Sequence, residues 1–364
     1  MIVQDVINYL EELSPLAYAE DFDNVGLLVG NQNTQITGIL VTLDTLEAVV
    51  DEAIENSCNL IVSFHPIIFK GLKKLTGKSY VERVVMKAIK HDIAIFAMHT
   101  ALDNALQGVN NMICEKIGLI NRKILIPQSG TIKKLTSYAP KDEADKLREA
   151  LFNAGAGSIG NYNECSFNTE GIGTYKGNLN SNPSKGKKGS LHFEPEIQIS
   201  VTYAKHLENK IIKTLFRVHS YDEVAYEITT LENKNQLIGM GMIGEFKIPM
   251  EETSFLNHIK GVMNAKCIKH SVLLGKPIHK VAVLGGSGSF AINKAKANNA
   301  DVFITADLKY HDFFKAEKNI ILVDIGHYES EQFTKNVLVA FLIKKMPNFA
   351  VVLSKTNTNP VKYF

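Results

Sequence analysis

The chain contains 364 residues, carries a formal net charge of +2 and is 45% apolar. Its length exceeds that of one typical domain, so we expect two domains or one domain that carries an insertion. The near-neutral charge argues against nucleic acid or an anionic membrane as a partner, and no segment has the roughly 20 continuous apolar residues that span a bilayer. The four cysteines form no CxxC pair, which favours free thiols in a reducing compartment. We therefore expect a cytoplasmic protein.

The first 130 residues alternate between strand and helix patterns. The predicted strands cover residues 38–43, 59–63 and 93–98. The predicted helices cover residues 4–13, 44–57, 80–91 and 104–117. Asp44 and Thr45 are suited to cap the second of these helices. Such alternation is typical of a sheet with helices on its faces.

The segment 131–235 follows a different order. Its predicted elements are strand 134–139, helix 141–154, strand 162–167, a polar stretch over 171–190, strand 196–203, helix 205–218 and strand 223–231. Two βαβ halves joined by a polar loop predict a ferredoxin-like βαββαβ domain. We interpret the lysines at 185, 187 and 188 as part of a solvated loop rather than a phosphate site.

From residue 236 the earlier alternation returns. The predicted elements are strand 280–284, helix 290–297 and strands 301–305 and 320–323. The glycine run 285–288 matches no phosphate-loop pattern, and we interpret it as a tight turn. The sequence thus predicts an α/β core domain with mixed sheets, built from residues 1–130 and 236–364 and interrupted by an α+β insert over 131–235.

Histidines and carboxylates follow three of the predicted core strands, where ligands of α/β sheets collect. His65 follows strand 59–63, and Pro66 ends that strand. His99 and Asp103 follow strand 93–98, while His327 and Glu331 follow strand 320–323. The last two are four residues apart, so a helix would place them on one face.

Each of these residues also has a structural interpretation. Taken alone, a histidine and a glutamate at this spacing, such as His327 and Glu331, are more often a solvated surface pair, and His65 is equally typical of a hydrogen-bonded histidine at a strand end. His99 is suited to a backbone contact or a second shell, and Asp103 to a helix N-cap. Near the next strand end, Asp307, Lys309 and His311 are compatible with a loop without chemistry. Taken together, imidazoles and carboxylates without cysteine favour zinc, iron or manganese, and such an ion lowers the pKa of bound water towards ~7.

Several motifs occur in a fixed order: Asp21-Phe-Asp-Asn-Val-Gly-Leu-Leu-Val-Gly30, Ser63-Phe-His-Pro66, His99-Thr-Ala-Leu-Asp103, Asp307-Leu-Lys-Tyr-His-Asp312 and Gly326-His-Tyr-Glu-Ser-Glu331. Through them the chain resembles the NIF-three-like family, also named GTP cyclohydrolase 1 type 2 homologues, over nearly its whole length. The middle segment is similar to the PII/CutA-like insert of the longer members of that family.

The resemblance implies a two-metal site with His65, Asp103, His327 and Glu331 as ligands, and with Glu331 as the bridging residue. Many members carry two successive histidines before the proline, whereas this chain has Phe64 at the first position. Because phenylalanine cannot coordinate a metal, we expect one or two ions, with His99 or water as a replacement ligand. His99 or His311 would then shuttle protons.

The resemblance also implies a hydrolase that opens the guanine imidazole ring of GTP with loss of formate. No triphosphate clamp is evident, so hydrolysis of another small molecule stays open. The alternative is a metal-binding regulatory or ligand-sensing oligomer that acts through its insert. A nucleic-acid scaffold is the least favoured interpretation. By resemblance, we expect a homo-oligomer in the form of a hexameric toroid with the inserts at its ends.

Overall fold

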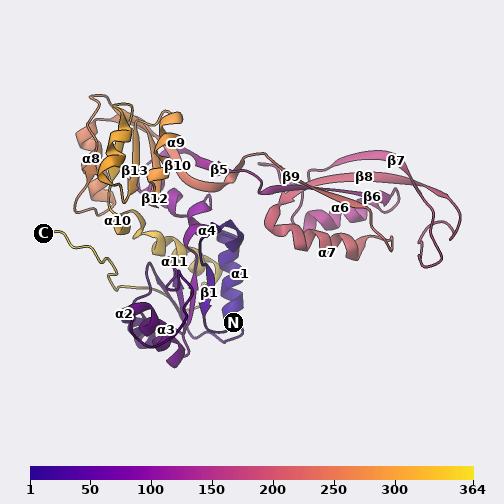
Figure 1. Cartoon of the computed structure of the whole chain (residues 1–364), viewed down its shortest axis with the longest axis horizontal. Coiled ribbons are helices and arrows are strands. Elements are labelled where there is room, and N and C mark those ends of the chain that lie inside the picture. The colour runs from indigo at the N-terminus through magenta and orange to yellow at the C-terminus, as the bar shows by residue number, and fades with distance from the viewer. The chain divides into compact units, whose positions relative to one another are not determined.

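The computed structural model describes residues 1–364, which divide into two compact units (Figure 1). The first unit consists of Met1–Pro127 and Gln236–Phe364, and the second consists of Gln128–Asn235. The second unit therefore interrupts the first in sequence. The expected mixed α/β architecture is confirmed, since parallel and antiparallel strand pairs occur within the sheets of the first unit.

A five-stranded sheet in the first unit has the order β1-β4-β3-β2-β15. Its strands are β1 (Gly26–Val29), β2 (Ile39–Thr42), β3 (Leu60–Ser63), β4 (Ala94–Ala97) and β15 (Val351–Leu353). Only β1 pairs antiparallel with its neighbour. Every residue of β2, β3 and β4 is buried. Such continuous apolar strands are typical of a sheet covered on both faces.

The helices on the two faces of this sheet are α1 (Val3–Leu13), α2 (Glu47–Glu55), α3 (Tyr80–Lys90) and α11 (Thr334–Lys345). Alternate strand residues serve the two faces because side chains of a strand alternate in direction. Leu40 and Ile61 pack with α2 and α3, whereas Val41 and Val62 pack with α1 and α11. The longest helix has 12 residues, and no helix of the chain is long and apolar enough to cross a membrane.

A six-stranded sheet in the same unit has the order β11-β14-β13-β12-β10-β5, in which β12, β13 and β14 are parallel. Its strands are β5 (Ile120–Gln128), β10 (Asn235–Met250), β11 (Lys269–His270), β12 (Ile278–Ser287), β13 (Val302–Ala306) and β14 (Ile321–Asp324). The associated helices are α4 (His99–Asn104), α5 (Val109–Ile117), α8 (Glu252–Val262), α9 (Ile292–Ala297) and α10 (His327–Glu331), with the 3-10 helix η4 at Tyr310–Ala316. One hydrophobic core contains residues of both sheets, which fixes their strand ends relative to each other.

The second unit has its own four-stranded antiparallel sheet, with the order β7-β8-β6-β9. Its elements are β6 (Ile132–Pro140), α6 (Ala144–Asn153), β7 (Phe167–Tyr175), β8 (His192–Ala204), α7 (Glu208–Val218) and β9 (Tyr226–Leu231). This βαββαβ order and strand arrangement are ferredoxin-like. The two helices share a separate core with the sheet, to which Leu151 and Leu215 contribute fully buried side chains.

Two predicted elements differ from the structure. The helix predicted over 104–117 is broken, because α4 ends at Asn104 and α5 begins only after Gly108; a side chain at Gly108 would collide with the Leu102 carbonyl. Asp103 consequently lies inside α4 instead of capping a helix. The strand predicted over 162–167 is also wrong, since β7 begins at Phe167 and continues to Tyr175. Backbone pairing with β8 forms this exposed edge strand without an alternating apolar pattern.

The buried side chains of the second unit allow a direct test of its core. We expect Leu215→Ala to lower the free energy of unfolding of this unit by about 2–5 kcal/mol, because it leaves a cavity around a fully buried position. Lys213→Ala on the exposed face of α7 is the control and should change it by less than about 0.5 kcal/mol. Urea-dependent hydrogen exchange of the α6 and α7 peptides measures both. Equal effects of the two variants would contradict this assignment of the core.

Candidate metal centre

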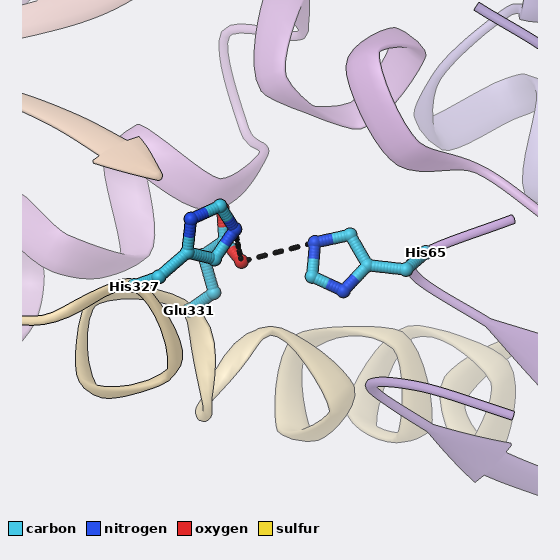
Figure 2. A group of neighbouring side chains, drawn as sticks. All are labelled: His65, His327 and Glu331. Carbon is cyan, nitrogen blue, oxygen red and sulfur yellow. Dashed lines mark ion pairs between the residues drawn. The ribbon is translucent and has the colours of Figure 1, made fainter. Parts of the chain in front are cut away.

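Two histidines and a glutamate converge between the two sheets of the first unit. His65 follows β3 of the five-stranded sheet, whereas His327 and Glu331 are the first and last residues of α10, which follows β14 of the six-stranded sheet. The Nε2 atoms of His65 and His327 each lie 3.2 Å from Oε2 of Glu331 (Figure 2). One ligand atom from each residue lies within 4.8 Å of the others. The predicted same-face position of His327 and Glu331 on a helix is therefore observed.

The carboxylate of Glu331 lies in a closely fitted space, with 4% of its side chain exposed. Gly286 at the end of β12 adopts a φ of +66°, and a Cβ atom there would lie 2.5 Å from Oε1 of Glu331. The backbone N–H of Gly286 donates to Oγ of Ser330, which fixes this turn against α10. The glycine run after β12 is thus a turn, as expected, and it makes room for the buried carboxylate.

Each histidine near the cluster is held by an aspartate at Nδ1. The distances from Nδ1 to the carboxylate oxygen are 2.8 Å for His65 and Asp44, 2.7 Å for His327 and Asp307, and 2.8 Å for His99 and Asp23. Each aspartate in turn accepts a hydrogen bond from a hydroxyl group: Asp44 from Thr358, Asp307 from Ser287 and Asp23 from Thr100. Carboxylates in this position orient metal-binding imidazoles and keep Nε2 available.

These three aspartates were not predicted as site residues. From the sequence, Asp44 is suited to a helix cap, Asp23 to a turn at the rim of the site or to a plain turn, and Asp307 to a loop without chemistry. A signal was nevertheless present, because Asp44 lies two residues after β2 and Asp307 directly follows β13. Applying the strand-end rule to every carboxylate, and not only to those in histidine-containing motifs, would have found both.

Asp103 and His99 border the cluster through a shared cavity. They line a cavity of about 230 Å³ together with His327 and Glu331. Oδ1 of Asp103 is buried and has no hydrogen-bond partner. His99 adopts a φ of +28°, which is unfavourable for a residue with a side chain. In this conformation its ring contacts Asp23. Both residues are thus placed beside the cluster, although the three-residue cluster itself does not include them.

The structure does not bring His311 to this site. His311 lies in η4, is exposed and packs its ring against Tyr310 and Phe314. It lines neither of the two cavities that border the cluster. Although His311 and Asp307 belong to the same sequence motif, only Asp307 therefore lies at the cluster.

A divalent ion fits the donor atoms that are present. Oε2 of Glu331 is buried and accepts no well-aligned hydrogen bond, although two imidazole nitrogens form ion pairs with it at 3.2 Å. Donor atoms bound to one tetrahedral zinc ion at about 2.0–2.1 Å are separated by about 3.3 Å, which is close to this spacing. Two imidazoles and two carboxylates without a thiolate suit zinc, iron or manganese.

The same contacts change the proton affinity of the cluster. Burial lowers the pKa of His65, but Asp44 and Glu331 outweigh burial and raise this pKa to about 10. Burial likewise lowers the pKa of His327, and Glu331 with Asp307 raises it to about 9. Burial, followed by the charge of Glu331, raises the pKa of Asp103. Without an ion, protons therefore occupy the atoms that a metal would use.

A second cavity of about 440 Å³ borders the cluster. Its lining combines aromatic, polar and charged groups: Leu43, Asp44, His65, Cys267, Lys269, Asp307, Asp324, Gly326, His327, Tyr328, Glu329, Asn359, Pro360, Val361 and Tyr363. A cavity of this size accommodates a small organic molecule. Lys269 is the single lysine in the lining, and it is paired with the buried Asp324 at 2.7 Å.

These pKa shifts predict how the metal-free protein responds to pH. A histidine whose pKa is raised on folding stabilises the fold most below its ordinary value of 6.5 and loses this contribution as the pH rises through its folded value. Asp103, with a raised pKa, acts in the same direction. We therefore expect the melting temperature of the metal-free protein to fall between pH 7 and 10.

Saturating zinc or manganese should reduce this fall, since the ion takes the place of the protons. His327→Asn should flatten the profile of the metal-free protein, whereas the control His311→Asn should retain it. Differential scanning calorimetry at each pH measures the effect, and a rise in stability over this range would contradict the prediction.

Known proteins similar to this chain share its whole length. The family described as Duf34/NIF3 (NGG1p interacting factor 3) matches residues 1–360. A Bacillus subtilis protein named GTP cyclohydrolase 1 type 2 homolog is 36% identical over 365 residues, which cover 99% of this chain and 98% of the relative. A Listeria monocytogenes protein of the same name is 35% identical, with 97% of this chain and 96% of the relative covered.

Solved structures give the same result for the fold. The crystal structure of a Bacillus cereus protein related to NIF3 has a TM-score of 0.86 at 34% identity and covers 100% of this chain and 99% of that protein. A Staphylococcus aureus protein has a TM-score of 0.80 at 31% identity, with the same coverage. The resemblance to the NIF-three-like family is confirmed, and the chain belongs to the Duf34/NIF3 family.

Proposed function

We propose that the chain is a cytoplasmic hydrolase that depends on a divalent metal, with zinc, iron or manganese held by His65, His327, Glu331 and Asp103. The observation that carries this proposal is the convergence of two imidazole Nε2 atoms on one buried carboxylate oxygen, each at 3.2 Å. The four free cysteines fit the reducing compartment that the proposal assumes.

An ion in this place would supply Lewis-acid activation of water and of a polar substrate bond. The remaining chemistry belongs to the residues around it. His99 is the candidate for proton transfer, since Asp23 holds its Nδ1 and its ring lines the 230 Å³ cavity beside Glu331. Phe22 and Phe290 border the same cavity and give it an apolar wall. His311, the other candidate from the sequence, is placed less favourably.

The name of the relatives suggests a purine nucleotide as substrate and ring opening with loss of formate as reaction. The lining of the 440 Å³ cavity argues against a triphosphate, because Lys269 is already paired and no arginine is present. We therefore propose a small molecule of low negative charge as substrate, with a nucleoside or a nucleoside monophosphate as the first class to test.

The function is tested by formate release from GTP, guanosine monophosphate and guanosine in the presence of zinc, manganese or iron(II). We expect turnover that requires the ion and favours the less charged substrates. Absence of formate and of any ring-opened product with every metal would overturn the cyclohydrolase assignment. A wider panel of amides and cyclic ureas then tests hydrolysis in general.

Glu331→Gln tests the ligand set. We expect it to weaken metal binding by more than the 10–100-fold that is typical of changes outside the ligand shell, because an amide cannot replace the charge of the carboxylate. Glu317→Gln is the control, since Glu317 is exposed and pairs only with Lys296. Competition with a chromophoric chelator measures the affinity. Similar affinities of both variants would place the ion elsewhere.

The number of ions is tested at Phe64, which is fully buried with its ring centroid 5.7 Å from that of His99. We propose that the chain binds one ion, since Phe64 has no donor atom at the position where the family resemblance implies a further histidine. Phe64→His should allow a second ion per chain, whereas Phe64→Leu should retain one. Elemental analysis of the purified proteins counts the ions, and two ions in the natural chain would contradict this proposal.

A second candidate function is ligand sensing by the insert, which we propose is PII/CutA-like. A cavity of about 430 Å³ in the second unit supports it, with Tyr175, Tyr221 and Glu196 among its lining residues. The hydroxyl of Tyr221 donates to Glu196 at 2.6 Å. A thermal-shift screen with nucleotides and amines tests this function. Stabilisation should disappear in Tyr221→Ala and persist in Glu331→Gln; no stabilised ligand would remove the support for this candidate.

We further propose that the chain forms a homo-hexamer, an assembly suggested by resemblance. Light scattering during gel filtration should then give six times the chain mass of 40.3 kDa. A monomer at micromolar concentration would contradict the assembly.

A further inference from the structure

The last eleven residues, 354–364, form what we call the C-terminal strap. The strap follows β15 and has no helix or strand of its own. Side chains and backbone groups of Ser354, Lys355 and Thr356 donate to the carboxylate of Glu52 on α2. The start of the strap is therefore held by hydrogen bonds to the Glu52 carboxylate, together with a backbone bond from Ser354 to Val41 of β2.

The strap next reaches the partner of His65. Thr358 is buried, and its hydroxyl donates to Oδ2 of Asp44, while Oδ1 of the same carboxylate contacts Nδ1 of His65 at 2.8 Å. These are the hydrogen bonds of the Asp44 side chain. Thr358 therefore determines how the Asp44 carboxylate is oriented towards the imidazole.

Beyond Thr358 the strap contacts the other half of the cluster. Nδ2 of Asn359 donates to Oε1 of Glu329 at 3.1 Å. Glu329 is buried on α10, between His327 and Glu331. Gly326 makes room for it, since a Cβ atom there would lie 2.3 Å from Oε2 of Glu329. The strap thus links the β2 end that carries Asp44 with the helix that carries the other two ligands.

Three hydrogen-bonded triplets, each of a histidine, an aspartate and a hydroxyl group, surround the cluster. The hydroxyl groups come from different parts of the structure. Thr100 directly follows His99, and Ser287 lies at the end of β12, beside the strand that leads to Asp307. Only Thr358 comes from a segment without secondary structure at the end of the chain. The orientation of His65 through Asp44 consequently depends on Thr358, which lies in a segment outside any helix or sheet.

We propose that Thr358 is a positioning residue for the metal ligand His65, and that the C-terminal strap thereby controls metal affinity. This inference rests on the proposed metal site. Removal of the hydroxyl frees Oδ2 of Asp44, so that the carboxylate and the imidazole lose their fixed orientation. Changes of this kind outside the ligand shell typically weaken metal binding by about 10–100-fold.

The test uses the full chain with Thr358→Val, Thr358→Ser and Thr356→Val. The valine variant preserves the shape of threonine and lacks the hydroxyl, whereas serine retains the hydroxyl. Thr356→Val removes a strap hydroxyl that donates to Glu52 and not to Asp44. Zinc affinity is measured against a chromophoric chelator, and the visible absorption of bound cobalt(II) reports the ligand geometry.

We expect Thr358→Val to weaken zinc binding by about 10–100-fold and to change the cobalt spectrum, while Thr358→Ser and Thr356→Val retain both. Natural affinity in Thr358→Val would overturn the inference, as would an equal loss in Thr356→Val, which would indicate a general loosening of the strap. Glu331→Gln distinguishes a failure of the proposed metal site from a failure of the strap inference. If the natural chain and Glu331→Gln bind zinc equally weakly, the metal site itself fails; if only Glu331→Gln loses zinc, the strap inference alone fails.

Discussion

A buried carboxylate between two imidazoles is the interaction on which the rest of this site depends. Glu331 is 3% exposed and lies at 3.2 Å from a nitrogen of His65 and from one of His327. A carboxylate in such surroundings is costly unless a positive charge accompanies it. Protons on the histidines supply that charge without an ion, and a divalent cation supplies it more fully. This charge requirement is the basis of the metal site that we propose.

The surrounding structure keeps the three donor groups in place. The two sheets of the first unit share one hydrophobic core, which fixes the end of β3 relative to α10. Gly286 provides the space for the carboxylate, and an aspartate holds the far nitrogen of each imidazole. Cavities of about 440 Å³ and 230 Å³ border the cluster, so small molecules and water can reach it. Such support outside the ligand shell is typical of functional metal sites.

The sequence contained enough information for the core strands and for the residues that follow them. Strands β2, β3 and β4 are short apolar runs buried throughout, and such runs are recognisable without a structure. His65, His327 and Glu331 could be predicted because they follow such strands and because residues four apart share a helix face. Asp103 was assigned by resemblance and lies beside them. His311 occurs in an equally suggestive motif, yet the direction in which η4 leaves the strand takes it away from the cluster.

Other parts depend on contacts that no local pattern encodes. An aspartate after a strand is as typical of a helix cap as of a histidine partner, and the cap predicted at Asp44 and Thr45 is wrong, because α2 begins after Leu46 without a side-chain cap while Asp44 contacts His65. The edge strand β7 exists through backbone pairing, and its side chains are largely exposed. Thr358 lies 314 residues from Asp44 in the chain, in a segment without periodicity. Its importance could be seen only once both ends of the first unit were placed together.

Anomalous X-ray diffraction from crystals of the metal-loaded protein tests the central claim most directly, because it locates and identifies bound ions at their absorption edges. The account predicts one strong peak among Nε2 of His65, Nε2 of His327 and the carboxylate of Glu331. A peak bound only by other residues, or no peak in protein loaded with zinc, manganese or iron, would contradict it.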